Sequence, residues 1–176
     1  MTSRNLAASA AGAVLCMALA GPAAMPAWGL SSDSRQPIHL AADRADINRK
    51  TGISVYTGDV KVTRGTMRMT GDKLTVYTDK DGQVQKMVAV GKPATYRQLP
   101  DNKKQYLKGE GQTIEYYAGQ NRVVLLDRAR VWQGGNTFRS NRIVYSIAND
   151  VVNAGAASGK DRVHITIPPT KNTDSH

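Results

Sequence analysis

Apolar and polar side chains alternate one by one over most of the chain beyond residue 36. The run Val60-Lys61-Val62-Thr63 is one example, and Met67-Arg68-Met69-Thr70 is the next. Successive side chains of a β-strand point to opposite faces of the sheet, so a period of two predicts strands with one buried face. Apolar residues beyond residue 36 nowhere keep the 3.6-residue spacing of an amphipathic helix for three turns. The sequence therefore predicts an all-β protein.

Turn-forming residues separate the alternating runs at short intervals. Gly and Asn accept the positive φ angles that tight hairpins require. Such residues occur in Lys50-Thr51-Gly52, Arg64-Gly65, Asp81-Gly82, Ala118-Gly119-Gln120-Asn121, Gly134-Gly135-Asn136 and Ala148-Asn149-Asp150. The segments between turns indicate roughly fifteen short antiparallel strands of about 5–6 residues, the usual length. This pattern is typical of an open, twisted β-jelly roll or a two-sheet sandwich.

The chain also repeats itself at an offset of 69 positions. Four pairs of residues keep this offset: Val62 and Val131, Gly65 and Gly134, Met69 and Phe138, and Leu74 and Ile143. The shared unit is predicted to be a strand, a Gly turn, a strand, a polar tight turn and a strand. One unit alone has an exposed apolar face, which stacking on the second unit would cover. A chance likeness between two alternating segments is the alternative.

The N-terminal segment has a different composition. Arg4 is followed by an uncharged run as far as Ser32, and residues 6–20 are rich in Ala, Leu, Met and Val. One basic residue, a short apolar stretch and then small residues are typical of a secretory signal peptide. We expect cleavage after Ala27 or after Gly29. An uncleaved membrane anchor is the alternative, because the uncharged run is long enough to span about 30 Å of hydrocarbon.

Cleavage would remove Cys16, the only cysteine, and would leave 23 basic and 14 acidic residues, a net charge of +9. The mature chain would then have no disulfide and no thiol nucleophile. A basic surface favours an anionic partner, and in an exported protein a phosphorylated glycolipid or an acidic membrane is a better candidate than nucleic acid. A basic surface that serves only solubility is the alternative.

Three segments together carry a resemblance to a known family. They are Gln36-Pro37-Ile38-His39-Leu40, Tyr56-Thr57-Gly58-Asp59-Val60-Lys61-Val62-Thr63-Arg64-Gly65 and Gly91-Lys92-Pro93-Ala94-Thr95-Tyr96. In this order they resemble the OstA-like (LptA-type) family of periplasmic lipopolysaccharide-transport proteins, from about residue 36 to residue 168. The resemblance implies an open, twisted jelly roll whose two sheets enclose an apolar groove for lipid A chains. Trp132 and Phe138 are bulkier than Thr63 and Met69 at the matching positions, which leaves the groove width near the second repeat open.

The resemblance also implies partners. Domains of this family stack end to end as a bridge that carries lipopolysaccharide from the inner to the outer membrane. It implies a head-to-tail homo-oligomer, with an inner-membrane LptC-like component at the N-terminal edge and an outer-membrane LptD-like component at the C-terminal edge. Nucleic acid is not an implied partner. We expect the first strand, near residues 37–41, and the last strand, near residues 162–167, to be sheet edges that can add another chain.

Four segments are expected along the chain: a cleavable signal peptide over 1–29, a flexible segment over 30–35, one domain with two internal repeats over 36–168, and a disordered tail over 169–176.

Alternation places a set of mainly aliphatic and thioether side chains on the inner faces of the strands. A path for acyl chains needs apolar walls that can repack, and each methylene shielded from water contributes about 0.8 kcal/mol. By alternation and resemblance, the residues expected to line the lipid-binding groove are Ile38, Leu40, Val60, Val62, Met67, Met69, Leu74, Val76, Tyr96, Ile114, Val131, Phe138 and Ile143. Further residues expected on the inner face are Ile47, Val55, Val88, Val90, Tyr116, Val123, Leu125, Val163 and Ile165. From the residues alone, a packed core without a ligand is the alternative.

Four basic residues cluster near the turn at Pro100-Asp101-Asn102, and they are possible contacts for lipid phosphates or sugar acids: Arg97, Lys103, Lys104 and Lys108. A solvated loop is the alternative, since exposed lysines usually contribute little.

Catalytic chemistry has little support in this sequence. His39 and His164 alternate with apolar neighbours, so we expect both on outer faces. Without a mature cysteine or a pair of histidines, a zinc site is not expected, and neither a Gly-x-Ser-x-Gly elbow nor a phosphate loop occurs. We expect no enzyme activity, no metal and no cofactor.

Three hypotheses on function remain: a lipopolysaccharide-carrying bridge protein, a carbohydrate-binding β-sandwich, and a membrane-anchored relative in the same pathway. The N-terminal residue of the mature protein distinguishes the first from the third. Extraction of lipid from the purified protein distinguishes the first from the second.

Overall fold

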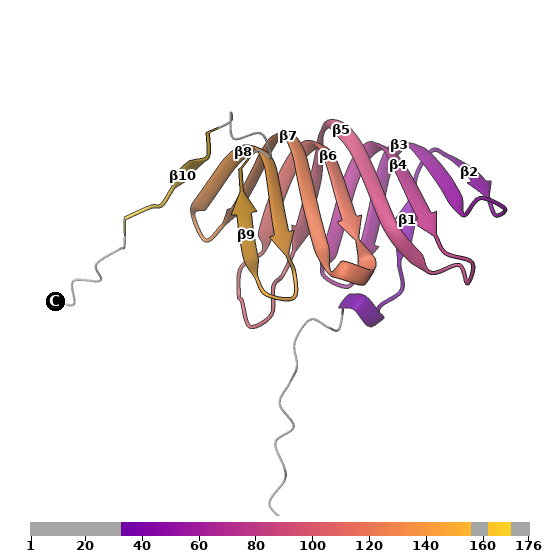
Figure 1. The fold of residues 1–176 in the computed structure, drawn as a ribbon, viewed down its shortest axis with the longest axis horizontal. Helices are drawn as coiled ribbons and strands as arrows, with labels where there is room; N and C mark the ends of the chain where they lie inside the picture. The colour runs from indigo at the N-terminus through magenta and orange to yellow at the C-terminus, as the bar shows by residue number, and fades with distance from the viewer. Residues whose placement is uncertain (1–32, 156–161, 170–176) are drawn as a thin grey trace, which may run out of the picture.

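The computed structural model describes residues 33–155 and 162–169 (Figure 1). The expected signal peptide, Cys16 and the end of the expected tail lie outside the described residues. Within the described ranges there are two 3₁₀ turns, η1 (Asp33–Arg35) and η2 (Ala118–Gln120), and all other regular structure is β-strand. The all-β prediction is confirmed. Over the part of the chain that is described, no helix has the length and apolarity needed to cross a membrane.

In the described part of the chain, ten strands form one open antiparallel sheet (Figure 1). They are β1 (His39–Ala41), β2 (Arg44–Asn48), β3 (Ile53–Arg64), β4 (Met67–Thr78), β5 (Val84–Gln98), β6 (Leu107–Tyr117), β7 (Arg122–Gln133), β8 (Asn136–Ser146), β9 (Val151–Ala154) and β10 (His164–Thr166). The order is β1-β3-β4-β5-β6-β7-β8-β10, while β2 also pairs with β3 and β9 also pairs with β8. The first and last strands are therefore both at edges, as predicted.

Each of the six central strands, β3 to β8, is 11–15 residues long, about twice the predicted length. The polar segments predicted to be tight turns, such as Thr70–Lys73, are irregularities inside long strands, where the pairing register shifts. Similar shifts occur between Thr57 and Val60, Val90 and Ala94, Glu110 and Thr113, and Leu126 and Ala129. Bulges bend a strand without ending it, which is why there are ten strands and not fifteen.

These irregularities line up across the sheet in a row that we call the seam. The backbones approach so closely there that glycine is required: a Cβ on Gly71 would lie 2.7 Å from the carbonyl oxygen of Val90, and one on Gly111 would lie 2.8 Å from that of Leu126. Pro93, which has no N–H to donate, falls in the gap in the β5 ladder and so costs the sheet no hydrogen bond.

The seam divides the sheet into two arms that fold over one core. We define arm A as residues 44–48, 53–57, 73–78, 84–90, 113–117, 122–126, 142–146 and 151–154. We define arm B as residues 39–41, 60–64, 67–70, 94–98, 107–110, 129–133, 136–140 and 164–166. Gly109 of arm B lies against Leu125 of arm A, since a Cβ on Gly109 would be 2.6 Å from Leu125 Cδ2. The arms correspond to the two layers of the expected jelly roll.

The internal repeat is present in the hydrogen-bonding register. Strands β3 and β7 both have 12 residues, and β7 begins 69 positions after β3. Val62 pairs with Met69 as Val131 pairs with Phe138. The correspondence is therefore structural and not a chance likeness.

The predicted inner faces are correct for most residues and wrong for three. The three are Val55, Val88 and Val90. Thr75 faces outward because it lies between the buried Leu74 and Val76, and Val55 and Val88 stand opposite Thr75 on the two neighbouring strands, so they face outward too. Val90 also faces outward and is 43% exposed. The segment Met87-Val88-Ala89-Val90 is apolar at every position, so alternation could not choose between its two faces; the structure buries Met87 and Ala89.

Replacement of Gly109 tests whether the two arms pack directly on each other. In Gly109→Val the new side chain meets Leu125 of the opposite arm, and overpacking of this kind costs about 1–3 kcal/mol. We expect urea denaturation, followed by circular dichroism, to show this loss in the free energy of unfolding. Gly119→Ala is the control, since a Cβ there has no atom within 4 Å. Equal stability of the two variants would contradict the packing of the arms.

Candidate functional site

The thirteen residues expected to line a groove all belong to one apolar cluster between the arms. Ten of them are buried, and Ile38, Leu40 and Phe138 are partly buried and pack against the others. Buried apolar residues that the sequence analysis did not place inside are Met87, Ala89, Ala94, Leu107, Val124, Ala129 and Tyr145. Tyr145 lies two positions after the buried Ile143 and so on the same face of β8, which means that the alternation that found Ile143 could have found Tyr145 as well.

The apolar cluster reaches the surface between the tips of the arms, in two cavities. The first has a volume of about 200 Å³ and is lined by polar residues such as Asp33, Gln98 and Asp101 together with Tyr116 of the opposite arm. The second, which we call the mouth cavity, has a volume of about 240 Å³ and is lined by Leu107, Val131, Gln133, Asn136, Phe138, Asp150 and Val152. Both cavities present side chains of the apolar cluster: Met67, Tyr116 and Ile147 line the first, and Leu107, Val131, Phe138 and Val152 line the mouth cavity.

The turn η1 covers the first cavity. Asp33 is 4% exposed, and its carboxylate accepts hydrogen bonds from the Thr66 N–H (2.8 Å), the Thr66 hydroxyl (2.6 Å) and the Gln98 side-chain amide (3.1 Å). Tyr96 donates its hydroxyl hydrogen bond to Gln98. A buried carboxylate needs such donors. The flexible segment expected over 30–35 stays a prediction.

An ion pair joins the arms beside the mouth cavity. Lys103 Nζ, in the β5–β6 loop of arm B, lies 3.4 Å from Asp150 Oδ2, in the β8–β9 turn of arm A. The hydroxyl of Tyr145 donates to Asp150 Oδ1 over 3.3 Å. Burial raises the pKa of the neighbouring Asp101, and the charges of Asp33 and Asp150 raise it further. Of these three carboxylates, Asp150 lines the mouth cavity and pairs with Lys103, whereas Asp33 and Asp101 line the first cavity.

A further cavity lies outside the mouth cavity, and we call it the rim cavity. It has a volume of about 310 Å³ and is lined by Lys103, Lys104, Gln105, Gln133, Gly134 and Asn136. Gln133 and Asn136 line both cavities, so the two adjoin each other.

The structure separates the four basic residues that the sequence groups together. Lys103 and Lys104 line the rim cavity, whereas Arg97 and Lys108 stand opposite each other in the β5–β6 ladder. These two face outward from arm B, because the neighbours of Lys108 in the strand, Leu107 and Gly109, are buried. The guanidinium of Arg97 lies 5.0 Å from the centre of the Tyr106 ring.

Three further residues also lie on the outer face of arm B: His39, His164 and Trp132. His39 and His164 lie on that face, as predicted, since the core residues Leu40 and Phe138 fix the opposite parity. Trp132 also faces outward, where the guanidinium of Arg130 lies 4.8 Å from its ring centre. Of the bulky pair Trp132 and Phe138, only Phe138 therefore narrows the space between the arms.

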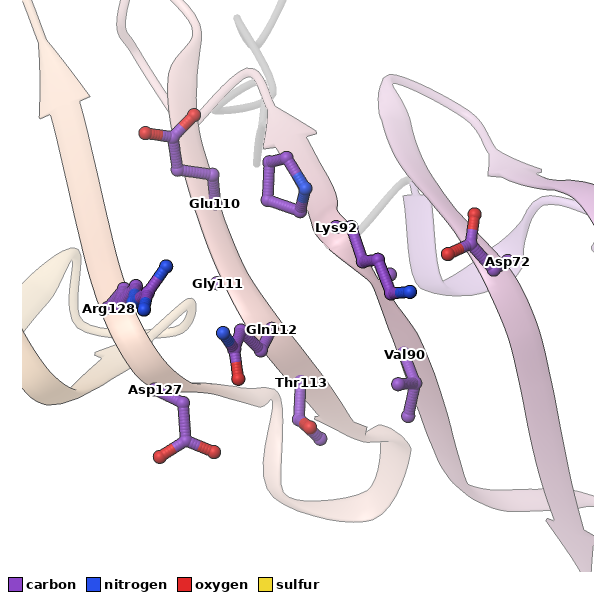
Figure 2. A pocket seen from close by; sticks show the side chains of 11 residues that line it. Asp72, Val90, Lys92, Glu110, Gly111, Gln112, Thr113, Asp127 and Arg128 are labelled. Carbon is purple, nitrogen blue, oxygen red and sulfur yellow. The ribbon is translucent and has the colours of Figure 1, made fainter.

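Another cavity, of about 610 Å³, lies along the outer side of the seam. Figure 2 shows its lining side chains, which come from four neighbouring strands and include Asp72, Lys92, Glu110, Asp127 and Arg128. Charges of both signs are mixed there, and none of the expected groove residues lines it. Among the described residues, no three His, Cys, Asp or Glu side chains gather as metal ligands. This cavity is not the site that the apolar cluster indicates.

Comparison with known proteins gives consistent results. The family model of the LptA/(LptD N-terminal domain) LPS transport proteins matches residues 39–151. The lipopolysaccharide export system protein LptH of Pseudomonas aeruginosa is 44% identical over 151 residues, which are 82% of this chain and 86% of that protein. The lipopolysaccharide export system protein LptA of Escherichia coli K12 is 29% identical over 147 residues, which are 83% of this chain and 79% of that protein.

The fold is similar to a solved structure as well. The crystal structure of LptH, the LptA-homologous periplasmic component of the lipopolysaccharide transport device of Pseudomonas aeruginosa, superposes with a TM-score of 0.74. The superposition has 44% sequence identity and covers 78% of this chain and 99% of that one. The open, antiparallel jelly roll is thus shared with that protein.

The pH dependence of stability tests how well the core excludes water. Burial raises the pKa of Tyr96 well above its ordinary value of 10.0. Above pH 10 the unfolded chain therefore loses a proton that the folded chain keeps, and stability should fall by up to about 1.4 kcal/mol per pH unit. We expect urea denaturation between pH 9 and 11 to show a smaller fall for Tyr96→Phe than for the unmodified protein. Tyr77→Phe, at a position that is 38% exposed, should leave the fall unchanged.

Proposed function

The chain belongs to the LptA/(LptD N-terminal domain) LPS transport protein family, and we propose that it carries lipopolysaccharide through the periplasm from the inner to the outer membrane. In this proposal the acyl chains of lipid A lie between the two arms, and the protein moves a lipid without catalysing a reaction. The observation that carries the proposal is the single apolar core between two arms that the seam connects.

The composition of this core suits a space that opens for a ligand. Met67, Met69 and Met87 are each at most 2% exposed, and unbranched thioether side chains repack more readily than branched ones. The polar contacts between the arms are few and lie at the tips, as in the Lys103–Asp150 pair. Parting the tips would exchange contacts between apolar side chains for contacts with acyl chains, so the hydrophobic stabilisation would be largely kept.

The periplasmic location rests on the N-terminal composition and on the family. Residues 6–20 have the apolar composition of a signal peptide core, and small residues follow them. The relative of known structure is itself a periplasmic component. We therefore propose a cleaved leader over about residues 1–29 and a single domain over residues 36–168.

The edges of the sheet support assembly of copies head to tail. The internal repeat makes β1 and β2 the equivalents of the two halves of β6: Leu40 pairs with Val62 as Gly109 pairs with Val131. The edge strands β1 and β2 thus correspond to β6, which has a neighbouring strand on both sides.

Strands β9 and β10 are likewise the equivalents of the two halves of β5. Ile165 pairs with Phe138 as Tyr96 pairs with Met69. Because β5 and β6 are neighbours in the sheet, their pairing is a template for joining the C-terminal edge of one copy to the N-terminal edge of the next.

This template gives a register for the joint. Tyr96 stands opposite Gly109, so Ile165 of one copy would stand opposite Leu40 of the next. Met87 stands opposite Tyr116, so Val152 would stand opposite Ile47. Ile165 and Ile47 are 56% and 61% exposed in the single chain, and the joint would cover both. Burial of apolar side chains favours association.

The same edges would bind the two membrane components. We propose that the edge formed by β1 and β2 takes an LptC-like inner-membrane component, and that the edge formed by β9 and β10 takes an LptD-like outer-membrane component. Both edges leave backbone N–H and C=O groups free to pair with a further strand.

A charge at the edge of the core tests the lipid path. Ile38 is partly buried against the core, so Ile38→Glu would bring a carboxylate against acyl chains, which costs several kcal/mol. We expect this variant to fold, by circular dichroism, and to lose the lipid that co-purifies with the unmodified protein. His39→Glu, next to it on the outer face, is the matched control and should keep the lipid. A folded Ile38→Glu protein that still carries lipid would remove Ile38 from the path.

Cysteine pairs test the register of the joint, since the proposed mature chain has no cysteine of its own. Arg97 stands opposite Lys108, so the equivalent positions are Thr166 and His39. We expect Thr166→Cys with His39→Cys to give a ladder of disulfide-linked multimers on a non-reducing gel, because opposed strand residues lie within disulfide range. Thr166→Cys with Ala41→Cys is two residues out of register and should give much less. Equal ladders from both pairs, or none, would contradict the joint.

A further inference from the structure

The mouth cavity and the rim cavity together have the chemistry of an amphiphile. The mouth cavity is lined by apolar side chains of the core such as Leu107, Val131 and Phe138, whereas Lys103 and Lys104 line the rim cavity. Gln133 and Asn136 line both, so a ligand can occupy the two at once. When an acyl chain occupies the mouth cavity, the polar head to which it is attached would lie in the rim cavity. Ammonium groups are strong partners for phosphate oxygens.

Asp150 stands between these two cavities. It lines the mouth cavity, and its carboxylate pairs with Lys103 of the rim cavity over 3.4 Å. Figure 1 shows the β5–β6 loop, which carries Lys103, beside the turn between β8 and β9, which carries Asp150. The two side chains are 51% and 33% exposed. A pair as exposed as this contributes little to stability, so another anion can replace the carboxylate at modest cost.

We propose that the rim cavity binds the phosphate groups of the sugar head of the carried lipid through Lys103 and Lys104, and that the head takes Lys103 from Asp150 as it binds. This inference rests on the proposed function. While no lipid is bound, the ion pair is one contact between the tips of the two arms. A phosphate that displaces Asp150 from Lys103 breaks this contact between the β5–β6 loop and the β8–β9 turn. The same binding event inserts the acyl chains, which requires the tips of the arms to part.

The other cations of the region do not fit this role. Arg97 and Lys108 lie on the outer face of arm B, on the far side of the strands from the core. Arg64 lines the neighbouring cavity under η1, but its guanidinium donates to the backbone carbonyls of Ser34 and Gln36. The carboxylates of Asp33 and Asp101 line the same cavity and would repel a phosphate. The mouth cavity is therefore the opening to the core that adjoins a cavity lined by lysines, the rim cavity.

Binding of lipid A tests this inference, with bis-phosphorylated lipid A and lipid A stripped of its phosphates as the two probes. We expect Lys103→Gln and Lys104→Gln each to weaken binding of the phosphorylated probe by about two- to fivefold at low salt. Asp150→Asn should strengthen it by a similar factor, because it removes the competing carboxylate. Lys80→Gln, in the exposed β4–β5 turn, is the matched control and should change nothing. The stripped probe should bind all five proteins alike.

Each contrary outcome has a distinct meaning. Unchanged or weaker binding of phosphorylated lipid A by Asp150→Asn would overturn the role of Asp150. Equal losses for both probes in the lysine variants would show that the lysines do not recognise phosphate. Inorganic phosphate that competes as well as the phosphorylated lipid would assign the site to the free ion and overturn the inference. If neither lipid bound the unmodified protein, the proposed function itself would fail, whatever the variants did.

Discussion

The seam interrupts the hydrogen-bond ladder at the same level in neighbouring strands, and the two arms, their common core and its mouth all follow from it. A regular sheet with strands of 11–15 residues would expose one of its faces to water along its whole width. Bulges at the seam, with Gly71 and Gly111 where no side chain fits, let the strands bend while the ladders continue on both sides. One sheet thereby covers its own apolar face.

The residues of that face were predictable where polar and apolar side chains alternate. Val60, Val62, Met67 and Met69 are examples, and all four are buried. The prediction failed at Val88 and its neighbours, because a run that is apolar on both faces has no period. Strand number was overestimated for a related reason: a polar residue pair at a bulge has the same composition as a tight turn. The all-β fold depends on neither detail, so it could be predicted.

The site around the mouth could be predicted only in part. The sequence shows the four basic residues as one cluster, but in the structure they form two groups. Arg97 and Lys108 point outward from β5 and β6, whereas Lys103 and Lys104, in the loop between these strands, line the rim cavity. The contact between Lys103 and Asp150 joins two loops that lie far apart in the sequence. No local pattern specifies such a contact, since it depends on how far the arms close. Asp33 is similar, because its partners Thr66 and Gln98 become neighbours only in the folded sheet.

The sheet order has a consequence for how the chain folds. From β3 to β8, each strand lies between the strands that precede and follow it in the chain. Contacts between strands one hairpin apart require only short loops to close, and chains with such local contacts fold faster than those with distant ones. Each new strand adds a piece to both arms at once, so the core grows with the sheet. A chain that emerges end-first can therefore fold in the order in which it appears, and no strand waits exposed for a distant partner.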